Sequence, residues 1–209
     1  LLTQSAPFSV VSTGTWVVSF AVGGRPGELD PMRDTLANVD AQGRAVPSAR
    51  FMGGREFDLL TGGDVREPDA QVLQRVIDDG IMILPSIVEG SGPYPKRKAE
   101  WDRANVPDVQ NAAASLYAAL MTRTCLELIG AAGPTIVEGP FAANRIYCSA
   151  LRSLTGRKVV ALPGMTGTSL GAALLAGADI RPRFETGEVP PLPAAFDRYA
   201  AEWQDAAGR

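Results

Sequence analysis

The sequence contains no histidine and only two cysteines among its 209 residues. The lack of histidine excludes Ser-His-Asp and Cys-His catalysis and every histidine metal site, and we assign no metal-binding residue to this chain. The two cysteines, Cys125 and Cys148, lie in segments with helical spacing, where a single cysteine usually behaves as a small buried hydrophobe. Because they follow no disulfide spacing, they favour a reduced, cytoplasmic setting over a secreted one.

Long apolar runs and an excess of charge of one sign are also lacking. No run reaches the roughly 18 apolar residues of a membrane span, so no membrane partner is predicted. A net charge of −3 gives no sign of a nucleic-acid surface, and the short basic cluster at residues 95–98 is typical of a solvated loop. The chain starts at Leu1 without a methionine, a few residues before a strand, so we expect it to be the later part of a longer protein.

The most informative stretch is residues 7–21. Two runs of β-branched and aromatic residues, 8–11 and 16–20, flank the polar break Ser12-Thr13-Gly14-Thr15. This pattern predicts a β-hairpin whose turn places a glycine at positive φ. Bare backbone at a glycine lets an anion approach the N–H groups, and Thr13 and Thr15 add hydroxyl groups. Taken alone, however, such a pattern more often marks a plain hairpin.

Strands and helices alternate along the rest of the chain. We expect strands at residues 37–41, 50–52, 135–137 and 158–162, and helices at residues 55–60, 69–79, 107–129, 142–154 and 170–175. Gly53-Gly54 lies where a strand enters a helix, which is a second place where phosphate could rest on bare backbone. A proline-rich stretch, 182–193, leads to a last amphipathic helix. With 45% hydrophobic residues, this order predicts an α/β layer architecture with a well-filled core.

Several motifs occur together in a specific order. They are STGTW at residues 12–16, IVEGPFAAN at 136–144, TGRKV at 155–159 and GTSLGAALLAG at 167–177. In this combination the chain resembles the C-terminal domain of the FGGY carbohydrate kinases, over nearly its whole length. The Thr-Gly-Thr-Trp form is most similar to the rhamnulokinase and fuculokinase branches. The resemblance implies an actin-like, ribonuclease H-like ATPase domain over residues 1–209, with a mixed sheet flanked by helices and with residues 182–209 as a proline-rich linker and terminal helix.

The resemblance also implies a function. It is ATP-dependent phosphorylation of a sugar, such as the ketoses rhamnulose, fuculose or xylulose, with ATP and Mg²⁺ as cofactors. This chain would supply the nucleotide-binding half, and an N-terminal domain of the same protein would bind the sugar. The catalytic base of the family is an aspartate expected upstream of Leu1, so no catalytic residue is assigned here and the chain alone is expected to be inactive. Whether the protein forms a homo-oligomer stays open.

Carried over by motif, nine positions are expected to hold the nucleotide. Thr13, Gly14, Thr15, Gly53 and Gly54 would lie at the phosphates, whereas Gly139, Pro140, Ala143 and Asn144 would border the adenine. The chain departs from the family where Glu138-Gly139-Pro140 replaces a run of glycines and where the adenine-side asparagine comes one place later. Because proline has no N–H, we expect weak hydrogen-bond recognition of the base.

Two other functions compete with this interpretation. One is a non-catalytic module on the same fold that responds to a nucleotide or a sugar, which the substitutions at Glu138 and Pro140 keep open. The other is a dinucleotide-binding domain of an oxidoreductase, which is weaker because no Gly-x-Gly-x-x-Gly follows a strand.

Overall fold

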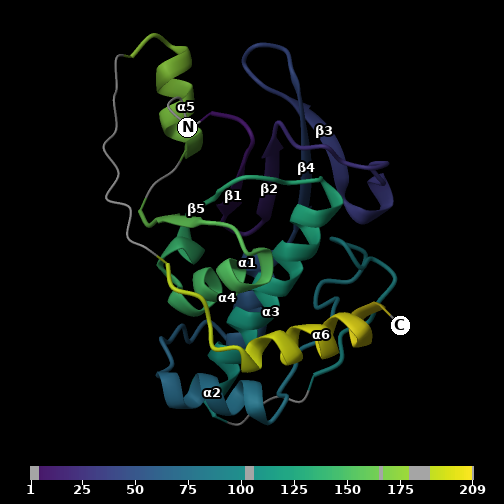
Figure 1. Ribbon diagram of the computed structural model, residues 1–209, viewed down its shortest axis with the longest axis vertical. Coiled ribbons are helices and arrows are strands. Elements are labelled where there is room, and N and C mark those ends of the chain that lie inside the picture. Colours follow the sequence, from purple (N-terminus) through teal and green to yellow (C-terminus); the bar gives the residue numbers. More distant parts are fainter. Residues whose placement is uncertain (1–4, 102–105, 165–166, 179–188, 209) are drawn as a thin grey trace.

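The computed structural model of the chain describes residues 5–101, 106–164, 167–178 and 189–208 (Figure 1). Its centre is a six-stranded mixed sheet with the order β3-β4-β2-β1-β5-β6. The strands are β1 (Phe8–Thr13), β2 (Val17–Val22), β3 (Thr35–Val39), β4 (Ala45–Phe51), β5 (Thr135–Glu138) and β6 (Val159–Leu162). The first four strands pair antiparallel, and β5 and β6 add in parallel to β1.

The predicted hairpin at the start of the chain is formed by β1 and β2. Phe8 pairs with Val22 and Thr13 with Val17, which leaves Gly14, Thr15 and Trp16 as the loop. The Gly14 N–H donates to the Trp16 carbonyl at 2.9 Å. The expectation of a positive φ at Gly14 is wrong, because the loop closes without a left-handed residue at this position.

The helices are α1 (Gly53–Thr61), α2 (Ala70–Asp78), α3 (Pro107–Leu128), α4 (Arg145–Thr155), α5 (Gly167–Leu175) and α6 (Ala195–Gly208), with 3₁₀ turns η1 (Pro31–Arg33) and η2 (Pro140–Ala143). Figure 1 shows α1, α3 and α4 against one side of the sheet, with α2 and α6 beyond them. Among the helices of the described residues, none combines the length and the apolar character that a membrane span requires.

Several predicted boundaries were wrong, including those of one helix and two strands. The helix expected at 142–154 is divided into η2 and α4, because the Asn144 side chain accepts from the Tyr147 N–H at 2.9 Å and caps a new helix. The strands expected at 37–41 and 50–52 are β3 and β4, and β4 is longer and contains Pro47. The proline fits because it lies past the last β2–β4 pair, Phe20 with Ser48, so its missing N–H leaves that ladder intact.

The core lies on the helical side of the sheet, around α3. The sequence predicted a helix at residues 107–129, in which Leu116, Leu120 and Leu128 repeat along one face, yet α3 is buried nearly all round. Its many alanines let the sheet, α1, α2 and α4 all approach it. Cys125 and Cys148 are both buried free thiols, and burial raises the pKa of Cys148 to about 12. Burial raises the pKa of Cys125 as well, which disfavours the reactive thiolate form of both residues at neutral pH.

The opposite face of the sheet carries a smaller apolar cluster of Phe8, Val10 and Ile136. Helix α5 lies apart from the other helices, and none of its described residues is buried (Figure 1). By contrast, the last helix, α6, is fixed tightly: Tyr199 Oη donates to the Ile81 carbonyl at 2.9 Å and Trp203 Nε1 to the Ile83 carbonyl at 2.6 Å. The proline-rich stretch predicted before it lies partly outside the described residues.

Candidate functional site

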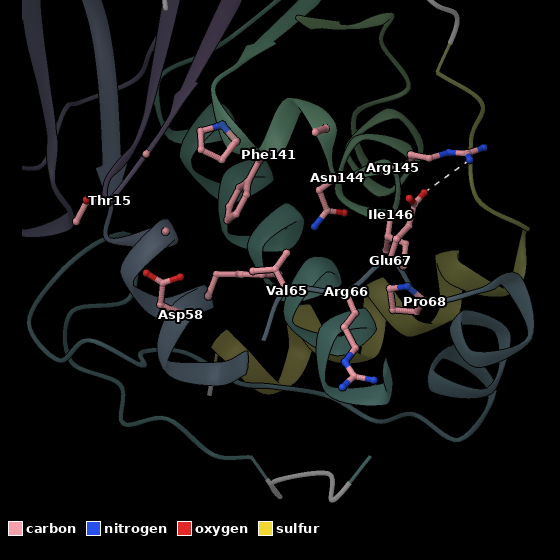
Figure 2. Close-up of a pocket in the computed structure, with 15 residues that line it drawn as sticks. Thr15, Asp58, Val65, Arg66, Glu67, Pro68, Phe141, Asn144, Arg145 and Ile146 are labelled. Atoms are coloured by element: carbon pink, nitrogen blue, oxygen red, sulfur yellow. Dashed lines mark ion pairs between the residues drawn. The ribbon is translucent and has the colours of Figure 1, made fainter. Parts of the chain in front are cut away.

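A cavity of about 490 Å³ lies beyond the carboxyl ends of β1, β4 and β5. Ligands of open α/β sheets commonly bind at this edge. The hairpin loop, α1, residues 65–68 and the η2–α4 junction surround it, and Figure 2 shows their side chains. The lining residues are Gly14, Thr15, Gly54, Phe57, Asp58, Val65, Arg66, Glu67, Pro68, Pro140, Phe141, Ala143, Asn144, Arg145 and Ile146.

Six of the nine positions expected from the sequence line this one cavity. They come from three parts of the chain and are Gly14, Thr15, Gly54, Pro140, Ala143 and Asn144. The remaining three, Thr13, Gly53 and Gly139, do not line it. The structure thus brings together residues that are up to 130 positions apart, from Gly14 to Asn144.

At one end of the cavity the hairpin loop rests on the first turn of α1. A Cβ atom at Gly54 would lie 2.0 Å from the Gly14 carbonyl oxygen, so only glycine permits this approach. The Arg55 N–H donates to the Thr15 carbonyl at 3.2 Å and fixes the contact. The N-terminus of a helix carries a partial positive charge and N–H groups without partners inside the helix. This end is suited to an anion such as a phosphate group.

The three predicted positions outside the cavity support it from behind. Thr13 is buried; its hydroxyl donates to the Glu138 carbonyl at 2.5 Å and accepts from the Phe141 N–H at 3.0 Å. Gly139 has a φ of 82°, and a Cβ there would lie 2.0 Å from the Thr13 carbonyl oxygen. A Cβ on Gly53 would point into the core, 2.5 Å from Val17 Cγ2. In this structure these three residues contribute to the packing of the strand ends, and their predicted place at a ligand stays a prediction.

The cavity also has an apolar floor. The rings of Phe57 and Phe141 pack edge to face, with their centroids 5.4 Å apart, and both residues line the cavity. Polar groups here are already engaged: Asn144 Nδ2 donates to Ser115 Oγ at 2.8 Å, and the Phe141 N–H is bonded to Thr13. Pro140 has no N–H to offer. A flat, apolar group would fit this floor with few hydrogen bonds.

Sequence reasoning missed the outer wall of the cavity, which is formed by residues 65–68. Val65 is 67% exposed, and Arg145 Nη1 lies 3.6 Å from Glu67 Oε1 (Figure 2). Arg66 pairs with Asp64 at 2.8 Å; the hydrogen bond from Arg66 lowers the pKa of the Asp64 carboxyl, and the same contact raises the pKa of Arg66. The only signal in the sequence was a charged segment between Gly62-Gly63 and Pro68, which is typical of any surface loop.

Two carboxyl groups on α1 have different surroundings. Asp58 is exposed and lines the cavity. Glu56 lies on the buried face of α1, where its carboxyl group accepts hydrogen bonds from the Val88 N–H at 3.1 Å and from Tyr117 Oη at 3.0 Å. Burial raises the pKa of Glu56, although both hydrogen bonds oppose the shift. Within the described residues, no group of three or more His, Cys, Asp or Glu side chains could hold a metal ion.

Comparisons with known proteins identify this architecture. A family model described as the C-terminal domain of the FGGY carbohydrate kinases matches residues 5–183. A carbohydrate kinase from Novosphingobium aromaticivorans is 38% identical, with a TM-score of 0.86 over 97% of this chain and 47% of that protein. The expected actin-like, ribonuclease H-like ATPase fold, a mixed sheet flanked by helices, is confirmed.

More distant solved structures share the fold alone. A xylulose kinase from Bifidobacterium adolescentis is 18% identical, with a TM-score of 0.62 over 96% of this chain and 44% of that protein. A Plasmodium falciparum glycerol kinase with ADP is 13% identical, with a TM-score of 0.62 over 96% of this chain and 46% of that protein. No curated protein matches the chain. The chain thus spans about half the length of the solved structures it matches.

Proposed function

Since the chain belongs to the FGGY carbohydrate kinase family, whose C-terminal domain it matches, we propose that it is the nucleotide-binding half of an enzyme that phosphorylates a sugar with ATP. The observation that carries the proposal is the convergence of six predicted nucleotide positions on one cavity, from the hairpin, α1 and the η2–α4 junction. The sugar-binding half would be an N-terminal domain of the same protein.

The two ends of the cavity suit the two ends of ATP. Gly14, Thr15 and Gly54 would hold the phosphates, because their backbone is bare and lies beside the N-terminus of α1. The adenine would rest on the floor made by Phe57 and Phe141, with Pro140, Ala143 and Asn144 at its border. Arg66 of the outer wall and Arg145 of α4 also line the cavity, where they pair with the carboxylates of Asp64 and Glu67.

Magnesium fits this cavity as a partner of the phosphates. Mg²⁺ in phosphoryl transfer is usually held by phosphate oxygens, waters and only one or two carboxylates. Asp58 lies one helical turn after Gly54 and would be that carboxylate. When bound, Mg²⁺ would neutralise the charge of the phosphates.

Transfer of the γ-phosphoryl group to a sugar hydroxyl demands mainly positioning and charge stabilisation from the protein. This chain would supply both for the nucleotide, with the hairpin loop and α1 orienting the phosphates and the apolar floor anchoring the base. A carboxylate that accepts the hydroxyl proton is also needed. We assign that base to no residue of this chain, and we propose that the chain alone transfers no phosphate.

The acceptor is proposed to be a ketose such as rhamnulose, fuculose or xylulose. Placement in the rhamnulokinase and fuculokinase branch rests on the Thr-Gly-Thr-Trp motif and stays a prediction, as does the cytoplasmic location, which rests on cysteine usage. Solved relatives include xylulose, gluconate and glycerol kinases, so acceptors of all three kinds belong in a screen.

The test is a measurement of ADP release by the full-length protein with MgATP and a panel of ketoses, aldoses, polyols and sugar acids. Turnover with a ketose supports the full proposal, and turnover with another acceptor corrects the substrate class. ATP binding without turnover on any acceptor would favour the non-catalytic module, which the Glu138-Gly139-Pro140 departure keeps as the second candidate. Absence of ATP binding would contradict both.

A further inference from the structure

We propose that Asn111 and Ser115, two buried polar residues one turn apart on α3, are positioning residues that set the width of the cavity where the base binds. This inference rests on the proposed function, because it assigns a role at the same site. Neither residue lines the cavity. Asn111 is 1% exposed and Ser115 2%, so neither serves to solvate the surface.

Asn111 makes three side-chain hydrogen bonds, and two of them hold the loop of the outer wall. Its Nδ2 donates to the Asp64 carbonyl at 2.9 Å and to the Pro107 carbonyl at 3.0 Å, and its Oδ1 accepts from the Arg66 N–H at 2.9 Å. Both amide hydrogens and one oxygen lone pair are used, which admits only one orientation of the side chain. The two loop contacts flank Val65, so one buried amide fixes the backbone on either side of that wall residue.

Ser115 holds the opposite wall. Its hydroxyl donates to the Asn111 carbonyl at 2.7 Å and accepts from Asn144 Nδ2 at 2.8 Å. Asn144 is the residue that caps α4 and lines the cavity. The outer wall and the α4 wall are thus tied to adjacent turns of one buried helix. The walls also meet directly in the ion pair of Arg145 with Glu67, but both of those side chains are exposed, so the pair holds the walls less firmly than the buried hydrogen bonds to α3.

The outer wall presents one exposed apolar side chain, Val65, at the cavity. Val65 is 67% exposed although it belongs to a loop whose neighbours on both sides are held by Asn111. In the view of Figure 2, Val65 and Arg66 lie below Phe141 and Asn144. A planar base between the wall and the Phe57–Phe141 floor would cover Val65 and remove its apolar surface from water.

The experiment compares ATP with inorganic tripolyphosphate as calorimetric titrants of the full-length protein with Mg²⁺. Tripolyphosphate occupies only the phosphate end, so its affinity reports that end separately. For Asn111→Leu we expect ATP affinity to fall by about tenfold or more and tripolyphosphate affinity to stay within about twofold. Val65→Ala, an exposed change that leaves the fold intact, should lower ATP affinity by about threefold with no change for tripolyphosphate.

Thr124→Val is the matched control, because Thr124 is also a buried polar residue of α3 but bonds the Leu120 carbonyl and Tyr94 Oη, neither of which belongs to a wall of the cavity. It should leave the ratio of the two affinities unchanged. The inference is overturned if folded Asn111→Leu keeps the wild-type ratio, or if both affinities fall together. Should Asn111→Leu not fold by thermal melting, Val65→Ala and Ser115→Ala decide, and an unchanged ratio in both overturns it. Wild-type protein that binds neither titrant contradicts the proposed function as well.

Discussion

At the hairpin end of the cavity, backbone packs directly on backbone, whereas at the α4 end side chains from three segments form the walls. The Gly14 carbonyl oxygen occupies the space that a Cβ atom at Gly54 would need. The Arg55 N–H donates a hydrogen bond to the Thr15 carbonyl. The α4 end depends instead on Asn111, Ser115 and Asn144, whose amide and hydroxyl groups connect α3 to the walls.

Because of this difference, we expect the two ends of the cavity to tolerate amino-acid substitutions differently. Backbone packing leaves no room for adjustment, so a single added methyl group must move a strand end or a helix. Walls held by side chains can shift or be replaced while the fold persists, and base preference can change without loss of the phosphate site. We therefore expect substitutions at the hairpin end to abolish binding and those at the α4 end to alter selectivity.

The strongest test is Gly54→Ala. Its Cβ would lie 2.0 Å from the Gly14 oxygen, so the hairpin loop must separate from α1. We expect stability to fall by about 1–3 kcal/mol and ATP affinity by about a hundredfold. Gly171→Ala is the control, because nothing lies within 4 Å of its added Cβ. Thermal melting and calorimetry of both variants check this, and wild-type ATP affinity in Gly54→Ala would remove the distinction between the two ends.

The next test is Gly14→Val, which probes the ligand side of the same contact. A Cβ there would meet only the Trp16 carbonyl oxygen, at 3.9 Å, and the residue has no positive φ. We expect an unchanged melting temperature together with about a thirtyfold loss of ATP affinity, since the side chain would occupy the space of the phosphates. Gly27→Val, at another open glycine, should change neither. A stable variant that binds ATP normally would show that the phosphates lie elsewhere.

A smaller effect is expected for base selectivity at the α4 end. Pro140 offers no donor, and the Phe141 N–H and the Asn144 side chain are engaged within the fold. We expect ATP and GTP affinities to agree within about tenfold, because few groups remain to recognise the base edge. Competition titrations measure this ratio. A preference of more than about a hundredfold for ATP would show that other groups of the wall donate or accept hydrogen bonds at the base, which contradicts this prediction.

The sequence predicted the hairpin end of the cavity better than the α4 end, for a physical reason. Glycines at strand ends are a local signal, since close backbone approach excludes a side chain, and Gly14 and Gly54 were found in this way. The same signal also marked Gly53 and Gly139, which do not line the cavity, because a glycine needed for packing looks identical to one needed for a ligand. The alternating elements likewise predicted the sheet, but not that α3 would be buried all round.

The outer wall could not have been predicted. Asn111 is one of several polar residues near the start of α3, and only the tertiary fold brings it to residues 64 and 66. Val65 and Arg66 carry no motif, and their place depends on how a loop 45 positions before Asn111 folds back onto the helix. Such contacts between side chains and a distant loop leave no periodic pattern in the sequence.

The smallest expected effect concerns Glu56, which supports α1 from behind and should affect stability without affecting the ligand. Burial raises its pKa in the folded state, so folding favours the protonated form; the stability it contributes is fully present below its ordinary pKa of 4.5 and is lost as the pH rises through the raised value. Gln in its place cannot ionise. The free energy of unfolding of Glu56→Gln should therefore rise relative to wild type as the pH increases from 4.5 toward neutrality.

Denaturant titrations at several pH values measure this difference, which we expect to stay within about 1 kcal/mol at low pH, where both side chains are neutral and bond Val88 and Tyr117 alike. At every pH the Glu56→Gln variant should bind ATP with the same affinity as wild type, because the hairpin loop meets α1 through Gly54 and Arg55 on the other side of the helix. A pH-independent difference in stability would contradict the raised pKa. A loss of ATP affinity would show instead that buried side chains, and not only backbone contacts, hold the hairpin end in place.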